Sequence, residues 1–384
     1  MNINNLDIYL LNLLFKYLKN NEVGLLQLTN KFFYKCTSEY QKYEIKEILK
    51  NNYYSKNIID IISTNRINHF YISNSEILEK ITIKPIIYII GTSYQDNTLG
   101  SVYKISYNYD FKEYRSYHLI STNINYFNKF MGIQLIYLGG ELLIIMHHKV
   151  KVYNLLSGIW SSYSIKSYNS DYIQFHKKCC IHDNQIYVTQ SYWNGNDDNF
   201  QYRSFPLAKL IFNNNEFKLE SFDIKTRLNK SRKGHSMVSF ENKLWVAGGK
   251  HEMEYLDTVE TFDFDIGVWK EEDNRMNVAR IDFKMKVINK TLYAIGGDAN
   301  NDLNITIERF DNLRREWNII TTKVIVSYYS IIVLENKILF FSKNLSNHIN
   351  ILDIYDVYKD EWSYNEIGSD MFRNSSLFSV GMRG

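Results

Sequence analysis

The stretch that decides the fold is Arg232–Trp269, which reads RKGHSMVSFENKLWVAGGKHEMEYLDTVETFDFDIGVW. Two short apolar runs flank a polar turn at 241–243, and the second run ends in the pair Gly248-Gly249. A charged loop follows, then a third apolar run over 259–264, and then Trp269. Short apolar runs bounded by turn residues are typical of β-strands. We therefore predict three strands and a fourth at the tryptophan, which together make one four-stranded unit.

The same pattern returns twice downstream, in 280–317 and in 327–362. Each copy has a polar turn, an apolar run, an aromatic-Asp pair and a closing tryptophan, and the first copy also keeps a double glycine. The three tryptophans, Trp269, Trp317 and Trp362, lie 48 and 45 positions apart. A repeat of this length is typical of β-propellers and of other closed repeat arrays.

The most regular marker of the repeat is an aromatic or apolar residue followed seven positions later by an aromatic residue. Clear pairs are Tyr153/Trp160, Phe262/Trp269, Phe310/Trp317 and Tyr355/Trp362, and weaker copies are Tyr107/Tyr114 and Leu210/Phe217. The pattern predicts a mainly β domain of six blades over 85–384. The blades are expected near 86–118 completed by 374–382, and near 132–164, 176–222, 232–271, 280–319 and 326–364.

The first unit lacks an opening strand, because the segment before Pro85 reads as polar or helical. The C-terminal segment 373–380, RNSSLFSV, resembles the opening of the fourth unit. We infer that the last strand returns to complete the first blade, which would close the ring and remove exposed strand edges. The alternative is that Ile77–Ile83 supplies this strand and that the tail is loose.

A double glycine after a short apolar strand, then Tyr or Phe followed by Asp, and then Trp resembles the kelch repeat. The resemblance covers roughly 86–384 and implies a six-bladed kelch β-propeller. It implies that the glycines permit a strained turn and that each tryptophan packs between blades. The residues that carry these structural roles are Gly248, Gly249, Trp269, Gly296, Gly297, Trp317 and Trp362.

The N-terminal residues lack the repeat and read as a small all-α domain, with an F-box-like segment over 1–40 and a helical spacer over 41–84. Apolar residues recur at helical spacing in the first helix, and the segment resembles an F-box, with Asp7 and Tyr9 in place of the usual Pro and Glu. The resemblance implies docking on a Skp-type adaptor subunit. The apolar anchors would be Leu6, Leu10, Leu14 and Leu18. The alternative is a remnant of the helical domain that precedes kelch repeats in BTB-kelch proteins.

Three arginines, Arg232, Arg280 and Arg373, stand at matching places before the opening strands of units. In kelch propellers an arginine at this point can line the mouth of the central channel, so the resemblance implies a cationic ring for an acidic peptide. The alternative is that these side chains donate hydrogen bonds to carbonyl groups of neighbouring blades. Extended loops could add specificity, at Lys250–Leu256, Asp298–Leu303 and Trp193–Tyr202.

The composition of the chain argues against several kinds of partner and of chemistry. The net charge is +3 and no basic block alternates with aromatics, so we expect no nucleic-acid partner. Three cysteines do not make a disulfide framework, which favours the reducing cytoplasm. No apolar run is long enough to span a membrane, and we expect no membrane partner. There is no phosphate loop, nucleophile motif or zinc spacing, so we expect no catalytic residue, metal or cofactor.

The leading hypothesis is a non-enzymatic adaptor that recognises the substrate of a cullin-type (SCF) ubiquitin ligase. The F-box-like helices would dock on the Skp-type subunit, and one face of the propeller would hold the protein target. One alternative is a kelch scaffold, for example a cytoskeletal or BTB-kelch-derived protein, with no ligase link. The other is an enzyme built on a propeller, which would need a bound metal or paired carboxylates in the channel.

Overall fold

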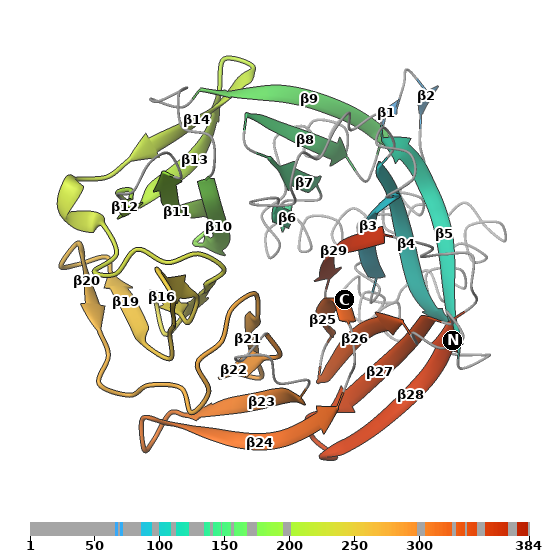
Figure 1. Ribbon diagram of the computed structural model, residues 1–384. Coiled ribbons are helices and arrows are strands. Elements are labelled where there is room, and N and C mark those ends of the chain that lie inside the picture. The colour runs from blue at the N-terminus through green and yellow to red at the C-terminus, as the bar shows by residue number, and fades with distance from the viewer. Residues whose placement is uncertain are drawn as a thin grey trace, which may run out of the picture.

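The structure is a computed structural model of the whole chain, and it describes sixteen segments of the backbone. These are residues 66–67, 70–71, 86–93, 100–108, 113–122, 134–138, 141–146, 148–154, 157–166, 175–194, 201–297, 304–324, 328–334, 336–343, 350–367 and 375–382. Within these segments the chain is mainly β. Its main strands form six four-stranded blades that stand around a common axis as in a β-propeller, and two neighbouring blades are joined into one larger sheet (Figure 1).

Each blade is numbered here in chain order, and its strands are given from the ring centre outward. Blade 1 has β29 (Ser375–Met382), β3 (Ile86–Ser93), β4 (Gly100–Asn108) and β5 (Glu113–Thr122); blade 2 has β6 (Gln134–Leu138), β7 (Glu141–Ile145), β8 (Lys149–Asn154) and β9 (Ile159–Lys166); blade 3 has β10 (Phe175–His182), β11 (Gln185–Asn194), β13 (Ala208–Asn213) and β14 (Glu216–Ser221). Blade 4 has β15 (Ser236–Phe240), β16 (Lys243–Ala247), β19 (Val259–Asp263) and β20 (Val268–Glu271); blade 5 has β21 (Lys284–Ile288), β22 (Thr291–Ile295), β23 (Asn304–Asp311) and β24 (Glu316–Val324); blade 6 has β25 (Tyr328–Leu334), β26 (Lys337–Lys343), β27 (Asn350–Asp356) and β28 (Glu361–Ile367).

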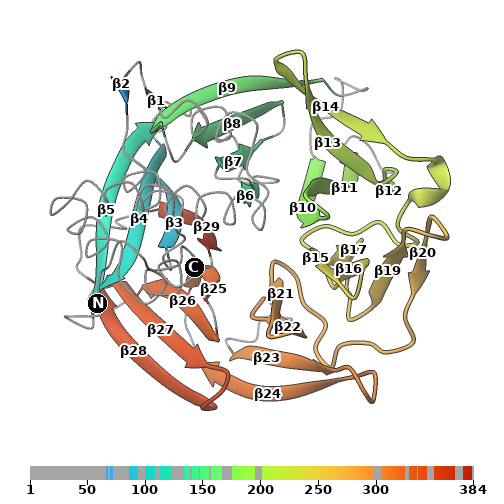
Figure 2. The ribbon, with the colours of Figure 1, turned by 180° about the vertical axis from the view of Figure 1, so that it is seen from behind.

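The innermost strands of the six blades make a closed ring. Each of them contacts the next, in the order β6, β10, β15, β21, β25, β29 and back to β6. The outermost strands lie at the rim, as the two opposite views show (Figure 1, Figure 2). Neighbouring strands within a blade are antiparallel throughout. The centre of the ring is therefore surrounded by residues that are far apart in the sequence.

Blade 1 joins the two ends of the propeller. β29 pairs with β3 along its whole length, from Ser375 opposite Ser93 to Met382 opposite Ile86. The C-terminal segment thus supplies the innermost strand of the blade, and the segment after Pro85 supplies the second. Because β29 also contacts β25 and β6, the ring has no open seam at this blade.

In blade 4 the observed strands follow the predicted pattern of three apolar runs and a tryptophan. The first hairpin turns at Glu241-Asn242, whose φ angles of 49° and 57° are left-handed. Two consecutive left-handed residues are typical of the tight hairpin turns that match strand twist. The corresponding hairpins of blades 3 and 5 turn in the same way at Asp183-Asn184 and Asn289-Lys290.

The repeated tryptophans lie between blades. Trp269 stands opposite Phe262, with ring centroids 5.4 Å apart. Its indole nitrogen donates a 2.9 Å hydrogen bond to the carbonyl of Thr226, in the segment that leaves blade 3. It belongs to an apolar cluster that also contains Tyr187 of blade 3. The equivalent pairs in blades 5 and 6, Phe310/Trp317 and Tyr355/Trp362, have ring centroids 5.2 and 5.1 Å apart.

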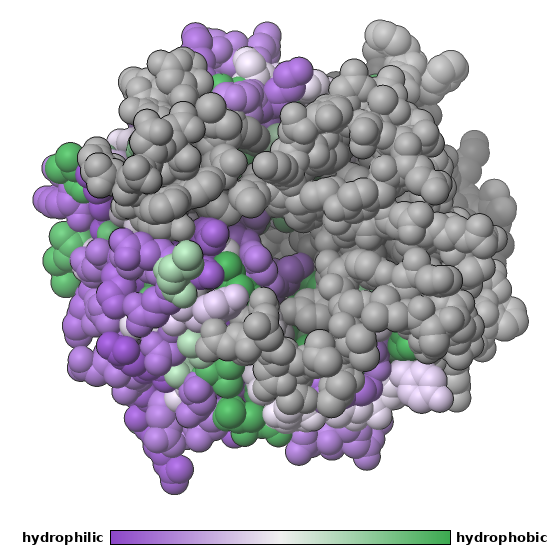
Figure 3. Space-filling model, in the orientation of Figure 1, coloured by the Kyte–Doolittle hydropathy of each residue, from purple (hydrophilic) through white to green (hydrophobic). Residues whose placement is uncertain are grey.

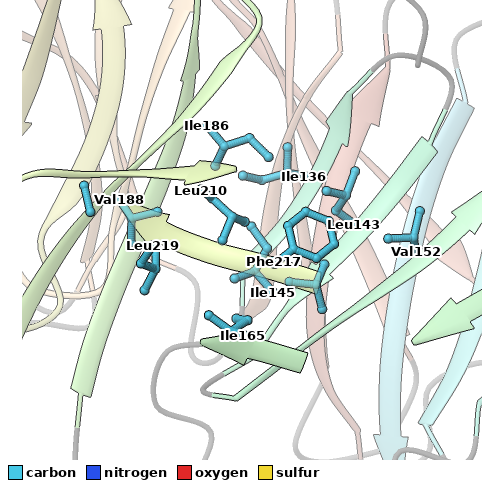
Figure 4. Packing of buried hydrophobic residues seen from close by; sticks show 12 residues of the cluster. Ile136, Leu143, Ile145, Val152, Ile165, Ile186, Val188, Leu210, Phe217 and Leu219 are labelled. Atoms are coloured by element: carbon cyan, nitrogen blue, oxygen red, sulfur yellow. The ribbon is translucent and has the colours of Figure 1, made fainter. Parts of the chain in front are cut away.

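Blade 3 departs from the seven-residue marker. Phe217 stands opposite Phe212, and Leu210 stands opposite Leu219, whereas the two marker residues of the other units stand opposite each other. The cause is a two-residue turn at Asn214-Asn215, with φ angles of 49° and 61°, which is two residues shorter than the turns of the other units. Phe217 nevertheless packs with Ile145 and other apolar side chains of blade 2 (Figure 4).

Two further features distinguish blade 3. β14 pairs in parallel with β9, which joins the rims of blades 3 and 2. In the region of the loop expected at Trp193–Tyr202, β11 continues to Asn194 and β12 (Gln201–Ser204) pairs with its end.

The F-box-like segment over 1–40 lies outside the described residues. Of the spacer over 41–84, the structure describes only β1 (Arg66–Ile67) and β2 (Phe70–Tyr71), which pair as a short hairpin. The expectation of helix through Phe70 is wrong at these residues. Apolar and aromatic residues on both sides of Asn68-His69 favour a turn between strands. In the described part of the chain the one helix is a 3-10 turn, η2 (Ile224–Thr226), and no helix there could cross a membrane.

The double glycine of blade 4 gives a direct test of the architecture. Gly248 has a φ of +60°, and a Cβ placed on it would lie 2.7 Å from the carbonyl oxygen of Arg280 in the next blade. Gly267 has a φ of +72° but no atom within 4 Å of such a Cβ. We predict that Gly267→Ala costs about 1 kcal/mol of unfolding free energy from backbone strain alone.

Gly248→Ala should lower the free energy of unfolding by about 3 kcal/mol or more, because the backbone of the next blade must move as well. Thermal denaturation of the two variants measures the difference. Equal losses would contradict the close approach between blades 4 and 5.

Candidate functional site

Arg232 and Arg280, predicted to line the propeller mouth, are both buried with no more than 1 % of the side chain exposed. Arg232 donates 3.1 Å hydrogen bonds to the carbonyls of Gly248 and Thr258, and its guanidinium forms an ion pair with Glu260. Arg280 repeats this arrangement one blade later. Its partners are the carbonyls of Gly296 and Thr306, at 2.7 and 3.0 Å, and the carboxylate of Glu308.

The carboxylates of these pairs also hold the segments that enter the blades. Glu260 accepts a 2.7 Å hydrogen bond from the backbone N–H of Asn229, and Glu308 accepts one of the same length from Asn277. Burial lowers the pKa of the Arg232 guanidinium, and the Glu260 carboxylate opposes that shift. Each pair is thus a satisfied polar network that ties the entry segment to the second and third strands of its own blade.

These contacts correct the expectation that Arg232 and Arg280 contact an acidic peptide. A guanidinium with no exposed surface and with carboxylate and carbonyl partners is not presented to a ligand. The alternative of hydrogen bonds to carbonyls describes them better, although the carbonyls belong to the same blade and not to a neighbouring one. Arg373 lies outside the described residues. It stands two positions before β29, whereas Arg232 and Arg280 precede their strands by four.

The loop Lys250–Leu256 forms a small hairpin, β17 (Lys250–His251) and β18 (Glu254–Tyr255). Its base is fixed by backbone hydrogen bonds of 2.8 Å from Lys250 to the carbonyl of Lys233 and from Leu256 to that of Gly249. Its tip carries Met253, which is 87 % exposed. A large apolar side chain held out on a fixed hairpin is suited to contact a partner. The loop over 298–303 lies outside the described residues.

A further site, which the sequence analysis did not identify, lies at the centre of the ring. The six innermost strands carry four lysines and no aspartate or glutamate. The lysines are Lys177 and Lys178 on β10 of blade 3, and Lys284 and Lys286 on β21 of blade 5; we refer to them as the lysine cluster. Both strands lie near the ring centre in Figure 1.

Burial lowers the pKa values of all four lysines of the cluster. Burial lowers the pKa of Lys284 to about 7, with further lowering by the charges of Lys286 and Lys178. Burial lowers that of Lys177 to about 8, and Cys179 opposes this shift. The pKa values of Lys178 and Lys286 are also lowered by burial. The cluster therefore carries closely spaced, incompletely solvated positive charge.

The described residues offer no catalytic arrangement. They contain no group of three or more His, Cys, Asp or Glu side chains that could hold a metal ion. Burial raises the pKa of the Cys179 thiol to about 12 and raises that of Cys180 further, so neither is a thiolate at neutral pH. His235 is buried between the carbonyl of Arg232 and the hydroxyl of Thr189, at 3.0 and 2.8 Å.

The recurring aspartates are turn residues. Asp263, Asp311 and Asp356 each accept a hydrogen bond from the backbone N–H two positions later, at 3.0, 2.9 and 3.0 Å. Such side-chain-to-backbone bonds shape the turn between the third and fourth strands. Backbone N–H donors lower the pKa of Asp311, which keeps it ionised. These carboxylates are spread over three blades and do not form an acid/base pair.

Comparison with known families identifies one matching segment. Residues 231–274 match the family model of the Kelch motif. The match covers blade 4 together with its entry segment, which contains Arg232, the double glycine and Trp269. The comparison with curated proteins gives no match. The motif and the ring of four-stranded blades fit a kelch-repeat protein, and a kelch repeat supports a role as a protein-interaction scaffold.

Proposed function

We propose that this chain is a non-enzymatic adaptor whose propeller holds a protein target and whose N-terminal segment docks on a Skp-type subunit of a cullin ubiquitin ligase. The observation that carries the first half is the kelch motif within a closed ring of blades. Kelch propellers are in general interaction domains without catalysis. The arginine–glutamate pairs and the turn aspartates of the repeat are engaged in the framework, which leaves the loops and the ring centre as contact surfaces.

The hairpin 250–256 is the best-defined target surface. Its base is bonded to the entry segment of blade 4, and its exposed tip carries Met253 beside charged residues. The described part of the face drawn in Figure 3 is predominantly hydrophilic, with scattered apolar residues. Because Met253 stands at the tip of a hairpin with a fixed base, it can enter a pocket of a partner without a large change of the backbone.

The ligase half of the proposal rests on the F-box resemblance of the N-terminal sequence. Four leucines, Leu6, Leu10, Leu14 and Leu18, recur on one face of the expected helix. An amphipathic helix of this kind can lay its apolar face in a groove of a partner. The chain order of an F-box-like segment, a spacer and a propeller is the order that an adaptor requires, with one part for the ligase and one for the target.

We predict that the purified chain captures a purified Skp-type subunit and that Leu10→Asp with Leu14→Asp reduces capture at least about tenfold. Two buried charges would each cost more than the 1.4 kcal/mol that corresponds to a factor of ten. Asn12→Asp is the matched control, since it adds charge to the same segment without removing an anchor leucine. A pull-down with purified components measures how much of the subunit wild type, the double variant and the control each capture.

If wild type and the double variant recover the subunit equally poorly, the ligase role fails and the kelch scaffold without a ligase link replaces it.

A further inference from the structure

The lysine cluster differs in its electrostatic surroundings from the cations of the framework. The framework cations Arg232 and Arg280 each face a buried carboxylate. In contrast, the innermost strands that carry the cluster contain no acidic residue. Repulsion among like charges in a partly dehydrated site costs free energy. The described innermost strands thus give the ring centre a positive potential.

The lysines of the cluster come from two blades that are not neighbours. Lys178 comes from blade 3 and Lys284 and Lys286 from blade 5, with β15 of blade 4 between them. Lys284 and Lys286 stand two positions apart on β21, so their side chains point to the same side of that strand. The charges of Lys178 and Lys286 both lower the pKa of Lys284, so both ammonium groups lie within electrostatic reach of that of Lys284. Lys178 also interacts with the carboxylate of Asp282.

Water and solutes reach this region. Lys286 is solvent-exposed although protein surrounds it closely enough to lower its pKa. Lys284 is partly exposed and uses one of its three N–H donors on the carbonyl of Ile331, at 2.6 Å. Both lysines are thus accessible to solvent and at the same time partly surrounded by protein. Where protein partly excludes water, the field of several like charges is concentrated.

We propose that the lysine cluster at the ring centre binds a compact oxyanion with two or more negative charges, of the phosphate type. Lysine suits this ligand because its ammonium group is a point charge with donors in several directions, whereas planar carboxylates favour the fork of arginine. A small polyanion can accept hydrogen bonds from lysines on both sides of the ring centre at once. This inference does not depend on the N-terminal segment or on the adaptor role.

Binding should be linked to protonation. Lys284, with a pKa of about 7, and Lys177, with a pKa of about 8, are partly neutral at physiological pH. A bound anion favours their charged forms, so binding takes up protons and weakens as pH rises. The other titratable groups around the cluster are Lys178, Lys286, Asp282, Cys179, Cys180 and His148. Among them Asp282 is the one carboxylate, and at neutral pH it opposes the anion.

The test is calorimetric titration of the full chain with inorganic pyrophosphate and, separately, with a phosphoserine peptide. We expect saturable binding, and Lys284→Met with Lys286→Met should weaken it by at least about tenfold, as two charge-assisted contacts are lost. Lys270→Met is the matched control, since Lys270 is exposed on β20 at the rim. If only pyrophosphate binds, the ligand of the site is a free anion. If the phosphoserine peptide binds more tightly, the ligand is a phosphoryl group carried by a protein.

Two further readouts separate loss of the site from loss of the fold. The double variant removes repulsion within the cluster but also the hydrogen bond from Lys284 to the carbonyl of Ile331, so its melting temperature should stay close to that of wild type. Sulfate keeps its charge between pH 6 and pH 9, so its affinity for wild type should fall across that range through the lysines alone. The proposal is overturned if neither phosphorylated probe binds, or if the folded double variant binds them as tightly as Lys270→Met does.

Discussion

Replacing Arg232 by methionine is expected to lower the free energy of unfolding by about 3–5 kcal/mol, because the buried carboxylate of Glu260 loses its counter-charge. The carbonyls of Gly248 and Thr258 would lose their donor as well. Melting measured by differential scanning fluorimetry should fall on the order of 10 °C. Arg280→Met should behave in the same way, since Glu308 takes the place of Glu260.

The control is Arg275→Ala, which removes an exposed arginine 3.5 Å from Asp257. Exposed pairs contribute at most about 1 kcal/mol, so this change should barely shift the melting temperature. The double change Arg232→Met with Glu260→Met should recover part of the loss, because no unpaired buried charge remains. If Arg232→Met were as mild as Arg275→Ala, the arginine would be available to a ligand and its assignment to the framework would be wrong.

Deleting residues 372–384 is expected to abolish cooperative unfolding of a soluble monomer. The deletion removes β29, which pairs with the whole of β3 and contacts β25 and β6. It would open the ring and leave β3 as an unpaired inner edge, which invites aggregation. The loss should approach the total stability of a typical domain, about 5–15 kcal/mol.

Deleting only 383–384 leaves β29 whole and is the control for this truncation. Size-exclusion chromatography compares the oligomeric state of the two truncated proteins, and limited proteolysis compares their resistance to cleavage. A soluble 372–384 deletion with the protease resistance and melting temperature of the control would mean that β29 does not seal the ring.

The repeat could be predicted from the sequence because its signals are local. The turn at Glu241-Asn242, the double glycine and Trp269 can each be recognised from a few consecutive residues, and they recur at nearly constant spacing. The marker failed in blade 3 because it counts residues and cannot recognise that Asn214-Asn215 makes a shorter turn. The helix expected through Phe70 failed for a related reason, since a weak helical pattern was extended across Asn68-His69.

The site was harder to predict because it depends on contacts distant in sequence. Both arginines have their glutamate partners 28 residues later, Arg232 with Glu260 and Arg280 with Glu308. That repeated spacing was present in the sequence and would have indicated an ion pair. The lysine cluster has no comparable signal. Its members become neighbours only when the strand order places β10 and β21 at the ring centre.

The central claim is that one chain holds two protein partners on separate parts, and affinity purification with mass spectrometry tests it most directly. We predict that wild type recovers a Skp-type subunit with its cullin, together with a target protein. Leu10→Asp with Leu14→Asp should lose the ligase subunits and keep the target, and Met253→Asp should do the reverse. Recovery of neither set by wild type, or loss of both sets together in each folded variant, would contradict the account.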